Sequence, residues 1–184
     1  MVNLEKIAIF CNFLFFRQFF SKTYASIQPR QEGFMKDYMI TDDTLAICPN
    51  GKGKATIIEK NSTFDVEISP RTIINKNSLM YGSSLDGRLE SSNYHVGRKY
   101  KQPLVISEIN DIILFPTRSP RLRSCIWINF INIKNILKDS ESNRGIIEFS
   151  NGILIDADIS FYILNNQYNN TLRLVAEYKK KHLN

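Results

Sequence analysis

The sequence predicts an α+β domain: a mostly antiparallel β-sheet with flanking helices and a C-terminal amphipathic helix. Short apolar runs separated by turn residues fill residues 39–68 and 104–155, and this pattern is typical of strands joined by tight connections. A serine followed by proline at 69–70 interrupts the strand pattern and marks a helix start. Apolar residues at three- and four-residue intervals in 160–181 mark a last helix.

Length and composition are those of one globular domain. The chain has 184 residues, of which 43% are hydrophobic and 23% charged, enough for a core and ordinary for a soluble protein. The three cysteines are far apart and lack paired spacing, so neither a disulfide framework nor a zinc site is predicted. Cys48 and Cys125 lie in apolar runs and are expected to be small buried side chains. A reducing, cytoplasmic location fits this usage.

Residues 1–34 are expected to be an N-terminal extension, and residues 35–184 the domain. Within the extension, residues 7–20 are apolar but too short and too interrupted, by Arg17 and Gln18, for a membrane span. They have a faint likeness to a signal peptide, and an amphipathic docking helix is another reading. We favour a translation start at Met35 or Met39, or a poorly ordered arm, because 28–33 reads as a linker.

The first strands are expected to form a small meander. An apolar run at 44–48 is closed by the turn 49–53, and further runs follow at 55–59 and 64–68. In the last of these, apolar and acidic residues alternate, which predicts a strand with one face in water.

Two helices are expected to follow. Ser69 suits an N-cap and Pro70 the first helical position, so a short helix should begin there and end at Gly82. A second helix is expected from Ser84 to a stop near Gly97, with early turns weakened by the glycine at 87.

The second half returns to strands and ends in a helix. The runs 104–107, 112–115 and 125–130 are apolar on both faces, so at least one strand should be central and covered on both sides. Asn151 and Gly152 between apolar runs favour a hairpin with a type I′ turn. The last helix should be capped by Ser160 and pack on its own sheet, although contact with a second copy is an alternative. Its expected apolar stripe is Phe161, Leu164, Tyr168, Leu172 and Val175.

The net charge of +6 is concentrated in the middle of the chain. Residues 69–125 hold nine basic and four acidic side chains. A localised basic block indicates a polyanionic partner, although a solvated basic face is an equal alternative. Arg118, Arg121 and Arg123 fall within six residues between two apolar runs. Trp127, just beyond them, is expected to be core because it lies in an apolar run.

Two upstream segments add further candidates for anion contacts. At 82–88, Ser83 and Ser84 stand at a helix start, where backbone and hydroxyl donors suit a phosphate, and Arg88 follows one turn later. An ordinary helix junction capped by serine explains the same residues. The basic residues around Tyr100 would add backbone affinity. They are Arg98, Lys99 and Lys101, with Arg71 and Lys76 as weaker candidates.

Five short motifs occur in a specific order and spacing. They are IIEK at 57–60, GSSxxGR at 82–88, LFPT at 114–117, CxWI at 125–128 and FSNG at 149–152. With this ordered set, residues 36–173 resemble the bacterial competence transcription factor family, ComK.

The resemblance implies a DNA-binding activator of genes for DNA uptake and recombination. It implies recognition of paired A/T-rich boxes, mainly through the minor groove, by dimers that assemble into tetramers. It also implies control by an adaptor and protease system. No enzyme activity, cofactor, metal or membrane partner is expected. The expected DNA-contacting residues are Ser83, Ser84, Arg88, Arg98, Lys99, Lys101, Arg118, Arg121 and Arg123.

Two other functions remain as alternatives. The basic face could meet an acidic protein partner. A small hydrolase could use Ser83 or Ser84 with His95 or Asp86, but no nucleophile elbow or oxyanion signature surrounds them.

Overall fold

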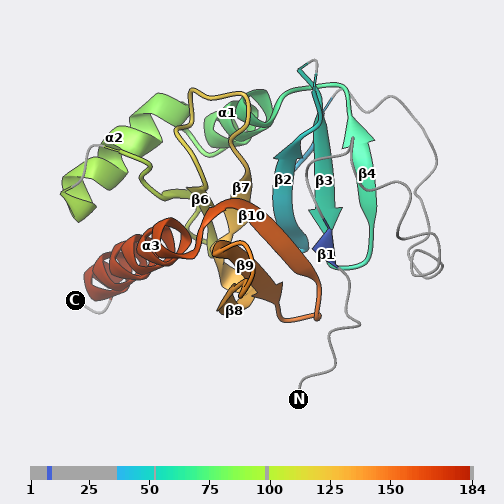
Figure 1. The fold of residues 1–184 in the computed structure, drawn as a ribbon. Coiled ribbons are helices and arrows are strands. Elements are labelled where there is room, and N and C mark those ends of the chain that lie inside the picture. The colour runs from blue at the N-terminus through green and yellow to red at the C-terminus, as the bar shows by residue number, and fades with distance from the viewer. Residues whose placement is uncertain (1–7, 10–36, 52, 98–99, 183–184) are drawn as a thin grey trace.

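The computed structural model describes residues 8–9, 37–51, 53–97 and 100–182. This part of the chain forms two β-sheets and three α-helices, with the last helix at its C-terminal end (Figure 1). The prediction of an α+β fold with a C-terminal helix is therefore confirmed. The division of the strands into two sheets was not predicted.

The larger sheet has six antiparallel strands in the order β4-β3-β2-β7-β6-β5. Its central pair, β2 and β7, joins the N-terminal meander to the strands that follow the helices. The strands are β2 (Thr44–Pro49), β3 (Ala55–Glu59), β4 (Thr63–Val66), β5 (Leu104–Ser107), β6 (Ile112–Pro116) and β7 (Trp127–Asn129).

The smaller sheet has the order β1-β10-β9-β8. Its β1–β10 pair is the only parallel one among the described strands, and it joins Ala8 to Leu154. The sequence interpretation missed β8 and the short 3-10 turn η1 (Phe130–Asn132) before it, because the apolar residues of β8 do not alternate and most of this edge strand is exposed. The strands are β1 (Ala8–Ile9), β8 (Ile133–Lys138), β9 (Arg144–Phe149) and β10 (Leu154–Ser160).

The two middle helices begin and end where capping residues predict. In α1 (Pro70–Met80), the Ser69 side chain accepts a hydrogen bond from the backbone N–H of Thr72. In α2 (Leu85–Val96), Ser84 accepts from the N–H of Gly87, and Gly97 ends the helix at a φ of 69°. That left-handed conformation suits glycine, which has no Cβ to clash.

The six-stranded sheet is the central layer, as expected from its two apolar faces. One face packs against α1 and α2, where Ile73, Ile74 and Leu85 meet Trp127. The other face packs against the smaller sheet, and that core includes Phe115 and Ile128 from the larger sheet. Trp127 is 1% exposed, so the prediction that it is core is confirmed.

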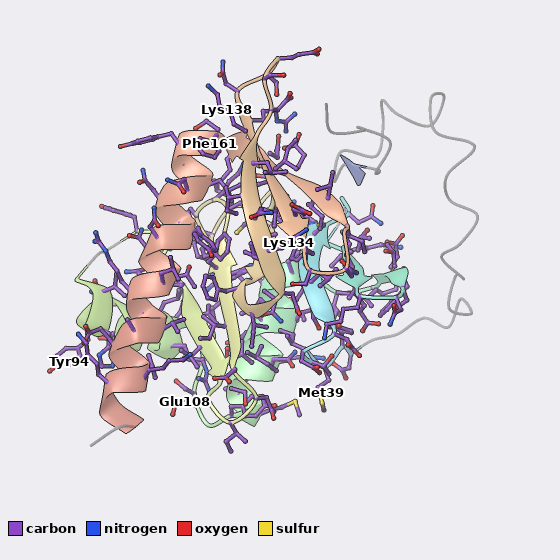
Figure 2. The ribbon with its side chains drawn as sticks, turned by 90° about the horizontal axis from the view of Figure 1, so that it is seen from below. Met39, Tyr94, Glu108, Lys134, Lys138 and Phe161 are labelled. Atoms are coloured by element: carbon purple, nitrogen blue, oxygen red, sulfur yellow. The ribbon has the colours of Figure 1, made fainter. Side chains whose placement is uncertain are left out.

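Helix α3 (Phe161–His182) lies along the smaller sheet; in Figure 2 its first residue, Phe161, lies near Lys138 of β8. It packs on its own chain, but the predicted stripe is partly wrong. Leu164 is fully buried, whereas Leu172 is 42% exposed. The buried line is shifted because polar side chains take part in it. Its fully or largely buried members are Leu164, Gln167, Asn170, Thr171 and Leu174.

The hairpin between β9 and β10 is confirmed, but its turn type is not. A type I′ turn needs positive φ at both central residues, and here only Gly152 has one, at 86°. The N–H of Gly152 donates to the carbonyl of Phe149 at 2.9 Å. The geometry is that of a turn followed by a left-handed glycine.

Three further expectations can be compared with the structure. Cys125 is a buried free thiol, but Cys48 is disulfide-bonded, so the prediction of a plain buried thiol is wrong there. No helix in the described ranges is long and apolar enough to cross a bilayer. Most of the N-terminal extension, residues 1–7 and 10–34, lies outside the described residues.

Candidate nucleic-acid interface

Residues 117–125, the arginine loop, connect β6 to β7 through two consecutive turns. Figure 1 shows it in yellow, near α1. The N–H of Leu122 donates to the carbonyl of Ser119 at 2.9 Å, and the N–H of Cys125 donates to the carbonyl of Leu122 at 3.2 Å. Pro120 takes the second position of the first turn, where its fixed φ is favourable. The loop therefore has a defined backbone conformation.

Arg118 anchors the base of the arginine loop to the smaller sheet. Its guanidinium donates to the Asp158 carboxylate at 2.6 Å and to the Asp158 backbone carbonyl at 2.7 Å. Asp158 lies in a bulge of β10, with a φ of 55°, and also pairs with Arg144. The structure thus gives Arg118 an internal partner, and its predicted contact with DNA remains a prediction.

Arg71 joins the arginine loop to the two middle helices. It lies in the first turn of α1, and its guanidinium pairs with Asp86 of α2 at 3.2 Å. It also donates to the carbonyl of Pro120 at 3.4 Å. The start of α2 and the arginine loop, which are separated by about thirty residues in the sequence, therefore lie on either side of one side chain.

Arg121 and Arg123 are the loop cations that are free to meet an anion. Both are exposed, and neither guanidinium has a hydrogen bond or ion pair with another described residue; only the backbone N–H of Arg121 is bonded, to the Ser119 hydroxyl at 3.5 Å. Most other basic side chains in the described ranges are paired within the chain. Examples are Lys54 with Glu67 and Lys134 with Glu148. The uncompensated positive charge near this end of the sheet thus lies on the arginine loop.

Lys101 adds a third cation close to the same loop. Burial raises the pKa of the Cys125 thiol to about 12, and the charges of Arg118 and Lys101 oppose that rise. Lys101 is therefore near the loop in space, and its φ of 52° turns the backbone sharply. Arg98 and Lys99, the other predicted cations of this connector, lie outside the described residues.

The predicted phosphate site at the start of α2 is largely used by the protein itself. The Ser84 hydroxyl accepts from Gly87, and the N–H of Leu85 donates to the Asn75 side chain at 3.0 Å. Ser83 lies beside them, with its hydroxyl 3.4 Å from the carbonyl of Ser84. The carboxylate of Asp86 also stands in the first turn. This geometry favours the alternative of a serine-capped helix junction.

Arg88 is a structural residue in this fold. It donates to the carbonyls of Val105 at 2.5 Å and Tyr81 at 2.7 Å, and so ties α2 to β5 and to the end of α1. Burial lowers the pKa of its guanidinium. Both terminal nitrogens of the guanidinium donate to backbone carbonyls of the chain, so few N–H groups of Arg88 remain to bind a phosphate.

The residues of the hydrolase alternative are not brought together. Ser84 caps the start of α2, whereas His95 lies in its last turn and packs against Tyr178 of α3. Eleven residues of helix span about 16 Å, so these side chains cannot form a nucleophile and base pair. Asp86 is engaged by Arg71. Within the described residues there is also no group of three side chains suited to hold a metal ion.

Asp158 is a residue that the sequence interpretation did not connect with this site. Only the fold brings it to Arg118, forty positions earlier in the chain. Arg71 was predicted only as a weaker candidate, because it lies far from the arginine loop in the sequence and its contact with Pro120 is formed by the fold. No pattern in the sequence could have paired either residue with this loop.

The geometry defines an α+β domain that presents a hydrogen-bonded, basic loop at one end of its central sheet. The ComK protein family profile matches residues 35–182, so the chain belongs to the ComK family. The competence transcription factor of Bacillus subtilis (strain 168) is 30% identical over 151 residues, covering 80% of this chain and 78% of that protein. No solved structure matches.

Proposed function

We propose that this chain is a transcriptional activator of competence genes that binds A/T-rich duplex DNA through the minor groove. In this proposal residues 35–184 are the DNA-binding domain, and the arginine loop makes the main contact. The single observation that carries it is the pair of exposed, unpaired arginines, Arg121 and Arg123, on a loop fixed at its base by Arg118 and Asp158. The name of the Bacillus subtilis relative supplies the biological context.

The chemistry of the loop suits a narrow minor groove. A/T-rich tracts narrow that groove and concentrate negative potential in it, which attracts arginine. Arginine is weakly hydrated and is well suited to leave water for such a site. Because the loop backbone is bonded through two turns, little conformational entropy is lost on binding.

Oligomerisation and regulation complete the proposal. Paired boxes would be bound by dimers or tetramers, since two-fold protein symmetry matches paired half-sites. Control by an adaptor and protease, and action in the cytoplasm, follow from the family resemblance.

The test is a titration of the full chain against A/T-box and G/C-rich duplexes at several salt concentrations. Arg121→Ala and Arg123→Ala should each reduce the salt slope by about one unit, since each removes about one phosphate-neutralising charge. Lys134→Ala is the matched control: its charge is already paired with Glu148 on the smaller sheet, outside the arginine loop, so it should reduce the slope less. A minor-groove ligand should compete with the protein.

The alternative of a basic module for an acidic protein partner predicts a different result. Such a module would bind A/T-box and G/C-rich duplexes equally weakly. The proposal is also wrong if the double variant Arg121→Ala with Arg123→Ala binds A/T-box DNA with the wild-type affinity and salt slope.

A further inference from the structure

The tip of the arginine loop carries an apolar side chain where a polar one would be usual. Leu122 is 53% exposed and stands between Arg121 and Arg123, which are both exposed. A connecting loop on a protein surface is commonly polar. Single exposed apolar side chains are common on protein surfaces, and Ile109 in another loop is 92% exposed. Leu122 differs because it stands between two unpaired arginines.

The backbone holds Leu122 at the junction of the two turns. Its N–H donates to the carbonyl of Ser119, and its carbonyl accepts from the N–H of Cys125. Arg121 precedes it inside the first turn and Arg123 follows inside the second. Leu122 is therefore held in place by hydrogen bonds on both sides, with a cation on each flank.

Side-chain contacts also hold the base of the arginine loop in place. Arg118 bonds to Asp158 on the smaller sheet, and Arg71 of α1 donates to the carbonyl of Pro120. Both anchors leave the Leu122 side chain free. Trp127, the large aromatic residue that follows the loop, is 1% exposed and cannot reach a partner. Leu122 is the exposed apolar side chain of the loop, since Pro120 is half-buried and lies inside the first turn.

We propose that Leu122 is a wedge that inserts between two base pairs of the bound duplex and unstacks them, an inference that rests on the proposed function. Proteins of the minor groove commonly insert leucine, phenylalanine, isoleucine, methionine or proline between base steps while neighbouring arginines neutralise the groove. Pyrimidine–purine steps such as TA unstack most readily. Leu122 therefore favours sites whose A/T-rich boxes contain a TA step, and it bends the DNA there.

The experiment uses the full chain and an A/T-box duplex with 2-aminopurine in place of one adenine at a TA step. This base is quenched when it is stacked and becomes fluorescent when it is unstacked. The wild type should raise its fluorescence several-fold at one step of the box. Leu122→Ala should bind with an unchanged salt slope but without that rise, and Leu122→Met, which keeps a wedge, should restore it.

A matched control separates insertion from general loss of apolar surface. Leu79 is 56% exposed at the other end of α1 from Arg71, and Leu79→Ala should behave as the wild type. The wedge is wrong, and the proposed function stands, if the wild type binds without unstacking any step or if Leu122→Ala unstacks as the wild type does. If no form of the protein binds the duplex, the proposed function fails and the wedge with it.

Discussion

Asp158 connects the smaller sheet to the arginine loop through side-chain contacts. It accepts from Arg118 of the loop and from Arg144 of β9. Its φ of 55° lies in the left-handed region, which aspartate and asparagine tolerate better than most residues. Charge and backbone conformation together explain an aspartate at this bulge.

Replacement of Asp158 by asparagine should isolate its charge. Asparagine keeps the tolerance for positive φ, so Asp158→Asn should lower the free energy of unfolding by about 1 kcal/mol, the upper range for partly exposed pairs. Urea denaturation would measure it. Glu67→Gln, which breaks the exposed pair with Lys54, is the control and should cost about 0.3 kcal/mol. Equal effects of the two variants would contradict a special role for Asp158.

Asp156 should make stability depend on pH in a definite direction. Burial raises the pKa of its carboxyl, and Arg144 opposes the rise. Because the folded pKa lies above the unfolded value of about 3.9, protonation favours the folded state. The stabilising contribution is complete below the unfolded pKa and is lost as the pH rises through the folded pKa.

In Asp156→Asn the free energy of unfolding should therefore depend less on pH between the unfolded and the folded pKa of Asp156. Urea denaturation at a series of pH values would measure this. A fall with pH that is equally steep in Asp156→Asn would show that another group titrates.

At the scale of elements, β9 and α3 approach so closely that only glycine fits at one position. A Cβ added at Gly145 would lie 2.6 Å from Cδ2 and 2.8 Å from Cβ of Leu164. Gly145→Ala should destabilise the fold by about 2 kcal/mol, typical of overpacking in a core, as measured by thermal or urea unfolding.

The comparison variant for this clash is Gly53→Ala. Gly53 has a φ of 81°, but nothing lies within 4 Å of an added Cβ. Its replacement should cost about 1 kcal/mol, from backbone strain alone. A smaller loss for Gly145→Ala than for Gly53→Ala would show that Leu164 moves aside easily.

Local chemistry explains which elements could be predicted. Serine caps at 69 and 84 and the glycine at 97 act within a few residues, so α1 and α2 were expected at the correct places. Strand β8 was missed because it lies at a sheet edge with mostly exposed residues. The stripe of α3 was misassigned because Gln167 and Thr171 are buried there, which an apolar periodicity cannot detect.

At the scale of the whole molecule, the described cores draw on residues from Tyr38 onward. The contribution of the described N-terminal strand is two residues paired with β10. A chain that starts at Met35 keeps these cores but leaves Cys48 without its disulfide, so it should fold with lower stability and bind A/T-box DNA with the same salt slope as the full chain. Circular dichroism and the salt titration would test it. Loss of folded signal in the shorter chain would show that the extension is part of the domain.

The sequence by itself determined the fold class, the caps of the middle helices, the core position of Trp127 and the family. These depend on local periodicity, capping and short ordered motifs, which can be read without knowing distant contacts. Only the tertiary structure decided which cations remain free. Arg118 and Arg88 are engaged by Asp158 and by backbone carbonyls far away in the chain. Arg121 and Arg123 are left unpaired because the loop turns them outward. The number of charges in the sequence cannot show that these two arginines are free while Arg118 and Arg88 are engaged.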